Sequence, residues 1–310
     1  MPSTVRAFVA GGNGVLGRAL LRLLIRDGHE VVATARTKEK ADLVRALGAE
    51  PVFVDLLNRD GLEFALQGCR WIFNATSAIP KDLTPDGSAW RANDRVRTEG
   101  TRNLTYAART VRVEAYVHES VALVFGDHGD AWIDERTSTN PGPRLGSAMD
   151  GERIVAEAVR DGLPAVVLRP GQFYAADAWH TRYIVDQLRA RKLRVPGRGQ
   201  NCVSPVHVED VAAAFVAAAR RAPAGETFLV ADDRPVTLRE YADVWAAALG
   251  APPAKSAPRF LARLALGRES LGLIAMSQRL SNRKAREGLG WAPRYPSITE
   301  GAAAVVRELR

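Results

Sequence analysis

A glycine-rich turn near the start of the chain constrains the fold more than any other feature. The segment RAFVAGGNGVLGRALLRLL, residues 6–24, consists of a short apolar run, three spaced glycines and a stretch with helical periodicity. Gly11, Gly14 and Gly17 follow the spacing Gly-x-x-Gly-x-x-Gly. A strand that leads through such a turn into a helix can present backbone N–H groups to a phosphate. The segment therefore predicts a dinucleotide-binding βα unit.

Strand-length apolar runs and helical stretches alternate through the first half of the chain. The runs are VRAFVA, EVVATA, PVFVDL, WIFNAT, EAYVHES and PAVVLRP. Continuous Val, Ile and Ala strands between helices indicate a parallel sheet covered on both faces. The expected α/β fold is a doubly wound parallel (Rossmann) sheet over residues 1–172, followed by a smaller C-terminal substrate-binding lobe over residues 173–310. We expect the chain to cross back to the core around residues 204–232.

Composition excludes several classes of protein. No apolar run approaches the ~20 residues of a membrane span. The net charge is +8, but the arginines are scattered and form no basic tract with interleaved aromatics. We therefore expect neither nucleic acid nor a membrane as partner, and leave a homodimer open. The two cysteines, Cys69 and Cys202, belong to no motif, which favours a reduced, cytoplasmic location.

The ends of the first four strands should hold the cofactor. Arg36, in ATARTKEK, stands where an NAD site places an acidic residue, and it can bind a 2′-phosphate, so we predict NADP over NAD. Asp55 is expected beside the adenine, and Ala75 and Thr76 beside the adenosine ribose. The predicted cofactor site is Gly11, Asn13, Gly14, Val15, Leu16, Gly17, Arg36, Asp55, Leu56, Ala75 and Thr76.

These features resemble the extended short-chain dehydrogenase/reductase superfamily, also called the NAD-dependent epimerase/dehydratase family. RTEGTRNL (residues 97–104) resembles a helix of that family, LRPGQFY (168–174) its sixth strand, and SPVHVEDVAAAF (204–215) its return to the core. The resemblance implies the same fold and a nicotinamide cofactor. It also implies a Tyr-x-x-x-Lys pair with a serine, in which the tyrosine exchanges a proton with the carbonyl oxygen.

That catalytic pair is missing, because no Tyr-x-x-x-Lys occurs in the sequence. Alignment on Glu152 puts Arg144 at the tyrosine place and Ala148 at the lysine place. Alignment on the glycine after the fifth strand puts Val121 at the serine place, with Ser120 one residue earlier. The chain is thus identified as an atypical member that needs another acid or base.

Several residues near the ends of strands four to six are candidates for that role. Glu119 can act as a base or acid with a raised pKa, or can pair with an arginine. Ser120 can orient a carbonyl oxygen or satisfy the strand end. Arg144 can stabilise an oxyanion or point to solvent. Tyr174, expected near the mouth of the site, is a displaced acid, and Asp127 is a second base.

The leading hypothesis is an NADP-binding oxidoreductase that acts on a carbonyl or hydroxyl of a small organic molecule. The alternatives are an isomerase, cyclase or lyase that uses Glu119 or Asp127 as base, and a catalytically silent NADP sensor. His128 and His180 have no second ligand at metal spacing, so no metal is expected. Tryptophans in loops should surround the pocket and favour an apolar or ring-bearing substrate: Trp90, Trp132 and Trp179.

Overall fold

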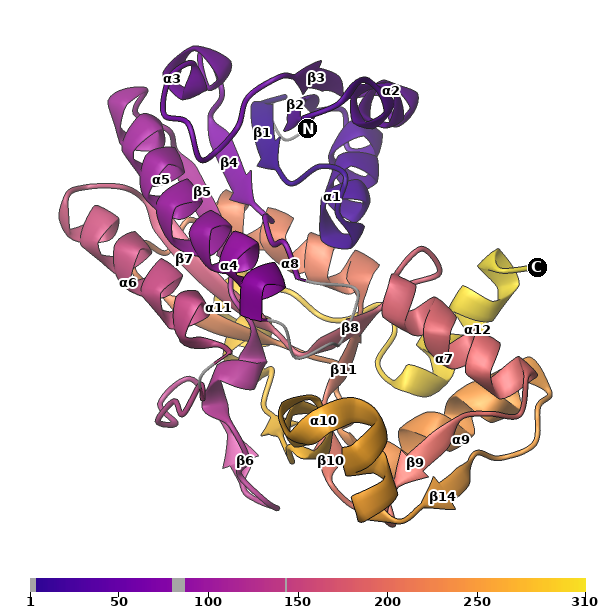
Figure 1. The fold of residues 1–310 in the computed structure, drawn as a ribbon. Coiled ribbons are helices and arrows are strands. Elements are labelled where there is room, and N and C mark those ends of the chain that lie inside the picture. The colour runs from indigo at the N-terminus through magenta and orange to yellow at the C-terminus, as the bar shows by residue number, and fades with distance from the viewer. Residues whose placement is uncertain (1–3, 80–86, 143) are drawn as a thin grey trace.

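The computed structural model describes residues 4–79, 87–142 and 144–310, and a parallel sheet of seven strands forms its centre (Figure 1). The strand order is β12-β7-β5-β4-β1-β2-β3, and all neighbours run parallel. This order confirms the doubly wound Rossmann prediction. The strands are β1 (Arg6–Ala10), β2 (Glu30–Thr34), β3 (Glu50–Val52), β4 (Trp71–Asn74), β5 (Ala115–Glu119), β7 (Ala165–Pro170) and β12 (Thr227–Val230).

Helices cover both faces of the sheet because successive strand residues point to opposite sides. In β1, Ala7 and Val9 join the core beneath α1 (Val15–Arg26) and α8 (Val208–Arg221), whereas Phe8 and Ala10 face the other way. The second face is covered by α3 (Leu62–Ala65), α5 (Thr101–Thr110) and α6 (Gly146–Arg160). The flanking elements are α2 (Lys38–Ala46), α4 (Gly87–Arg95) and α11 (Arg283–Leu289).

A second core lies beyond the carboxyl ends of the strands, on the lower right in Figure 1. It is built around Trp245, which is fully buried. Its helices are α7 (Trp179–Arg189), α9 (Leu238–Leu249) and α12 (Ile298–Glu308). Short strand pairs support them: β8 (Gln172–Tyr174) with β11 (Pro205–His207), β9 (Arg194–Pro196) with β14 (Lys255–Ala257), and β10 (Cys202–Val203) with β13 (Val236–Thr237).

Three further elements lie beyond the carboxyl ends of the strands. The helix α10 (Arg259–Ala275) lies at the bottom of the view in Figure 1, and β6 (Trp132–Ile133) lies at the lower left. The strand β15 (Arg279–Leu280) pairs with β6. None of the helices in the described ranges is both long and apolar enough to cross a bilayer.

The chain returns from the second core to the sheet through α8 and β12. The helix α8 packs against α1, and β12 adds a strand beside β7. The division into two lobes at residue 172, with the crossing around residues 204–232, stays a prediction. The expected third strand is shorter than PVFVDL, since β3 ends at Val52 and Phe53 is exposed at the edge of the sheet.

Candidate active site

The glycine turn joins β1 to α1 through two close backbone contacts. Gly11 has φ +84°, and a Cβ there would lie 2.4 Å from the Ala75 carbonyl oxygen. A Cβ on Gly17 would lie 2.1 Å from the Gly11 carbonyl oxygen. Side chains at these two positions would therefore collide with backbone, and only glycine lets the first helix approach the turn this closely.

The N-terminus of α1 has the properties of an anion site. Gly14 is its N-cap, no side chain caps the helix, and the first turn carries no acidic residue. A Cβ on Gly14 would touch one atom, the Gly11 oxygen at 3.2 Å. Asn13 anchors the turn by donating to the Thr34 carbonyl (3.1 Å), and its buried Oδ1 has no partner among the described residues. Uncapped N–H groups and open space above Gly14 fit a dinucleotide pyrophosphate.

The other predicted cofactor residues lie along the same edge of the sheet. Arg36 is exposed just after β2, with no ion pair in the described part of the chain. Asp55 is exposed and accepts from the Leu57 N–H at 3.0 Å, while Leu56 is buried. Ala75 donates to the Ala10 carbonyl (3.0 Å) and so lies beside the glycine turn, followed by the half-buried Thr76. Val15 and Leu16 form the first turn of α1.

Glu119 ends β5 as a buried carboxylate, 9% exposed. Its side chain accepts no hydrogen bond and forms no ion pair with any residue that the structure describes. Burial raises the pKa of Glu119 to about 7, and the positive charge of Arg97 limits the rise. A carboxyl group with a pKa near neutrality can both donate and accept a proton under physiological conditions.

The cation beside Glu119 comes from a π-helical segment, Val96–Gly100, between α4 and α5. Arg97 is 7% exposed, and its Nε has no partner among the described residues. Burial lowers the pKa of Arg97, and Glu119 is the largest charge opposing that effect. Sequence reasoning did not identify Arg97, although its segment RTEGTRNL was recognised as a family helix.

Ser120 belongs to a buried network under the site. Its hydroxyl donates to Glu152 Oε1 (2.5 Å), and Glu152 also receives two hydrogen bonds from Arg169, at 2.8 and 2.6 Å. The guanidinium of Arg169 lies 4.9 Å from the centre of the Phe125 ring. The hydroxyl of Ser120 is thus fixed by α6 and β7, and it stands one residue from Glu119.

Arg144 points inward, which rules out the solvent-exposed alternative. It lies just before α6, forms an ion pair with Glu269 of α10, and lies 5.2 Å from the ring centre of Trp90 on α4. Its buried Nη1 has no partner in the described ranges. Ala148, at the expected lysine place, is buried and offers no polar group. Arg144 therefore brings a fixed positive charge to this position.

The structure does not place Tyr174 at a solvent-accessible mouth, so that expectation is corrected. Tyr174 is completely buried in the second core, donates to Asp232 Oδ2 at 3.3 Å, and packs edge-on against Trp245. Burial raises its pKa strongly. Because its hydroxyl points into the second core, toward Asp232 and α12, Tyr174 cannot reach a substrate at the cofactor edge in this conformation. The prediction failed because β8 pairs with β11 and turns the ring toward α12 rather than toward the cofactor edge.

Asp127 has a structural role in this conformation. Its Oδ1 accepts from the N–H groups of Gly129 (3.2 Å) and Ser277 (3.0 Å), which ties the loop after β5 to the segment after α10. Because one carboxylate oxygen is occupied by two backbone donors, Asp127 is a weaker candidate for a base than Glu119.

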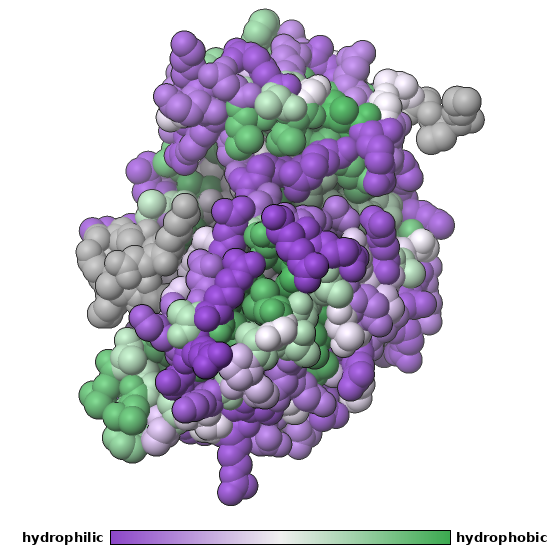
Figure 2. All heavy atoms as spheres, turned by 90° about the vertical axis from the view of Figure 1, so that its right-hand side faces the viewer, coloured by the Kyte–Doolittle hydropathy of each residue, from purple (hydrophilic) through white to green (hydrophobic). Residues whose placement is uncertain are grey.

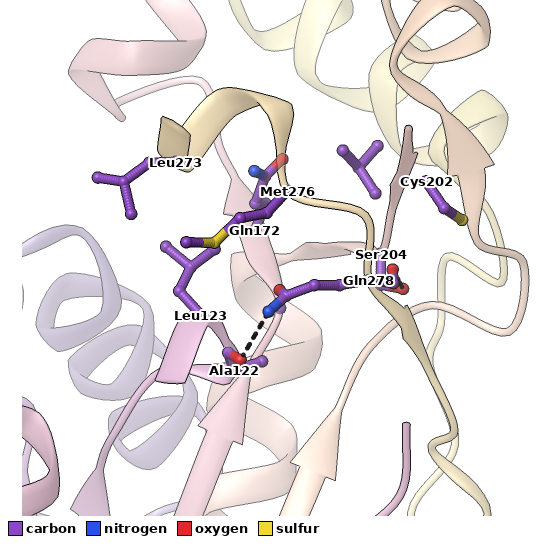
Figure 3. Close-up of a pocket in the computed structure, with 10 residues that line it drawn as sticks. Ala122, Leu123, Gln172, Cys202, Ser204, Leu273, Met276 and Gln278 are labelled. Carbon is purple, nitrogen blue, oxygen red and sulfur yellow. Dashed lines mark hydrogen bonds between the residues drawn. The ribbon is translucent and has the colours of Figure 1, made fainter. Parts of the chain in front are cut away.

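A small pocket separates this loop from the segment after α10 (Figure 3). Leu123, Leu273 and Met276 lie along one side, and Gln278 donates to the Ala122 carbonyl at 3.1 Å. Its volume, about 10 Å³, has room for one water molecule. Of the three tryptophans expected around the site, Trp90 contacts Arg144, whereas Trp132 is exposed on β6 and Trp179 begins α7.

Fold and glycine turn together define a Rossmann-type dinucleotide-binding protein. The sequence profile of the NAD dependent epimerase/dehydratase family matches residues 7–231. A ketoreductase from Stigmatella aurantiaca, named for a farnesylated 3-oxo-dihydroquinoline oxide, is 33% identical over 76% of this chain and 71% of its own. A 3-diazoavenalumate denitrifying reductase from Streptomyces is 32% identical over 96% and 99%.

Solved structures agree in fold. A human epimerase family protein with NADPH has a TM-score of 0.84 at 19% identity, with 98% of this chain and 100% of that one covered. The chain belongs to the NAD-dependent epimerase/dehydratase family, within the extended short-chain dehydrogenase/reductase superfamily. It is an enzyme that uses a nicotinamide cofactor, an NAD(P)-dependent oxidoreductase or a related enzyme.

Proposed function

We propose that this enzyme is an NADPH-dependent reductase that converts a carbonyl group of an apolar, ring-bearing small molecule into a hydroxyl, with Glu119 as the proton donor. One observation carries the proposal. A buried carboxyl group without a hydrogen-bonding partner among the described residues ends β5, at the sheet edge that also holds the glycine turn. In α/β folds of this type the cofactor and substrate meet at that edge.

The preference for NADPH rests on the region after β2. Arg36 is exposed and free of ion pairs among the described residues, and no acidic side chain occupies positions 35 to 38 to bind a ribose hydroxyl. A guanidinium can bind a 2′-phosphate through two hydrogen bonds. Lys38, also exposed, adds a second positive charge two residues later.

The chain's own residues would donate the proton and stabilise the charge that develops in the reaction. The bound cofactor supplies the hydride that adds to the carbonyl carbon. As negative charge develops on the carbonyl oxygen, protonated Glu119 transfers its proton there and becomes a carboxylate, which Arg97 stabilises. Arg144 adds positive charge at the place where the resemblance expects the tyrosine. Ser120, whose hydroxyl is committed to Glu152, holds the end of β5 in position.

Two observations support the substrate class: the contact between Trp90 and Arg144, and the name of one relative. Trp90 lies against Arg144, which provides a flat apolar surface beside a positive charge. The ketoreductase relative is named for a farnesylated ring ketone. Both points support a ring-bearing substrate with an apolar substituent.

The test follows the oxidation of NADPH with a panel of cyclic and aromatic ketones. We expect turnover with ring ketones, and Glu119→Gln should lower kcat by about 10²–10⁴-fold while NADPH binding is retained. Glu119→Asp, which keeps the acid but shortens the side chain, is the matched control and should keep partial activity. No substrate-dependent oxidation, or full activity in Glu119→Gln, would refute the proposal. A redox-neutral conversion that depends on Glu119 would indicate the isomerase or lyase alternative instead.

A further inference from the structure

The N-terminal half of α10 exposes large apolar side chains. Phe260 is 65% exposed, Leu261 47% and Leu264 80%. These residues share one face of the helix, since positions three and four apart lie side by side. Within the 17 residues of α10, Ala262 and Ser270 are buried, and Ala262 belongs to the opposite face. The helix thus turns its largest apolar groups outward, although a helix that only completed a core would bury them.

Basic residues flank this apolar face. Arg259, Arg263 and Arg268 are exposed on α10, and Lys255 is exposed on the adjoining β14. None of the four forms an ion pair within the described part of the chain. The sequence contains no Asp or Glu from residue 244 to residue 268. This half of the helix therefore presents positive charge without neutralising partners.

The face lies on the outer surface, near the candidate site. Figure 2 shows an apolar cluster at its lower left edge. The front of Figure 1, where α10 lies, faces that edge in Figure 2. Gly267, with φ +76°, kinks the helix behind the exposed half. Beyond the kink, Glu269 pairs with Arg144 and Leu273 lines the small pocket. One helix thus carries both the exposed face and a contact to the candidate active site.

We propose that this face of α10 docks on an anionic lipid surface. Apolar side chains flanked by Arg and Lys match the two components of a bilayer interface, acyl chains and anionic headgroups. A single short face of this kind gives reversible attachment, which differs from a membrane span. The proposal therefore departs from the expectation that no membrane is a partner, because that expectation rested on the lack of an apolar run long enough to span a bilayer. Charge complementarity favours a lipid surface over a second copy of the chain, because two copies would bring like charges together.

The test is co-sedimentation of the full chain with vesicles. We expect binding to vesicles of equal parts phosphatidylcholine and phosphatidylglycerol, weaker binding at high salt, and little binding to phosphatidylcholine alone. Leu264→Ser should lower the partition coefficient about tenfold, and Arg263→Gln about fivefold. The matched controls are Phe64→Ser on α3, where Phe64 is 78% exposed, and Arg102→Gln on α5; both should bind like wild type.

Circular dichroism and NADPH-induced thermal shifts verify that each variant folds. Failure of the wild type to bind anionic vesicles, or equal binding by Leu264→Ser and wild type, would overturn the proposal. It would also be overturned if light scattering showed a dimer that Leu264→Ser dissociates while neither protein binds vesicles. The readout needs no substrate, so it is independent of the proposed reductase activity.

Discussion

Arg97 lies opposite Glu119 without forming an ion pair with it, although both side chains are almost completely buried. Opposite charges that are buried together usually pair, because an unpaired charge in the interior is costly. Because no ion pair holds its charged form, Glu119 is more easily protonated.

Stability should depend on pH through Glu119. Burial raises its pKa from 4.5 to about 7, so between these values the folded protein keeps a proton that the unfolded chain has lost. Wild-type stability should therefore fall as pH rises through this window, by about 3 kcal/mol. Urea denaturation of cofactor-free wild type and Glu119→Gln at pH 5 and pH 8 measures this. The advantage of the variant should grow at pH 8, and a constant difference would contradict the assigned pKa.

Cofactor choice should depend on Arg36. Arg36→Ala should weaken NADPH binding by about 10–100-fold, the loss expected for hydrogen bonds to a charged group, and leave NADH binding unchanged. Calorimetry with both cofactors provides the measurement. Arg45→Ala, on the helix α2 that follows Arg36 and paired there with Asp42, serves as the control and should change neither affinity. Equal affinity of the wild type for the two cofactors would refute the claim.

Substitutions at two glycines of the turn, Gly14 and Gly17, should have different effects on stability and on cofactor binding. At Gly14, a side chain meets one backbone atom at 3.2 Å, so Gly14→Val should fold but lose cofactor binding. At Gly17, a Cβ meets the Gly11 oxygen at 2.1 Å, so Gly17→Val should lose stability even without cofactor. Thermal melting with and without NADPH separates the two effects. A normal NADPH-induced shift in Gly14→Val would show that the phosphate binds elsewhere.

The Glu152–Arg169 pair should be essential for stability. Arg169→Met leaves the buried Glu152 carboxylate without its cationic partner, with only the Ser120 hydroxyl bonded to it, and should cost about 3–5 kcal/mol. Arg153→Met is the matched control, because Arg153 pairs with Asp150 and Glu157 at the surface, and it should cost at most about 1 kcal/mol. If Arg169→Met and Arg153→Met lost equal amounts of unfolding free energy, burial of the Glu152–Arg169 pair would not explain its contribution to stability.

Arg144 should act as a fixed charge rather than as an acid. Arg144→Ala should lower turnover while the pH profile keeps its shape, because a guanidinium does not titrate in the working range. Glu269→Gln, which removes only the charge that holds Arg144, should lower turnover less. A shifted profile in Arg144→Ala would show that Arg144 controls the acid of the reaction.

The glycine turn and the alternating strands predicted the sheet because both are local patterns in the sequence. The position of Arg97 could not be predicted, since its direction depends on a π-helical segment that changes the helical register by a fraction of a turn. The contact between Arg144 and Glu269 joins residues 125 positions apart, and no sequence periodicity reports such a pair. Tyr174 was expected at the end of a strand, where it lies, but the pairing of β8 with β11 decided its direction.

The position of β12 at the edge of the sheet affects how the chain folds during translation. On a translating ribosome, the first six strands of the sheet emerge well before β12, which ends at Val230. Until then β7 presents an open edge and α1 lacks the helix that covers it, so the nascent chain exposes surface that could pair with another chain. Fragments that end before residue 230 should therefore aggregate, and a soluble cofactor-binding fragment should need to include both α8 and β12.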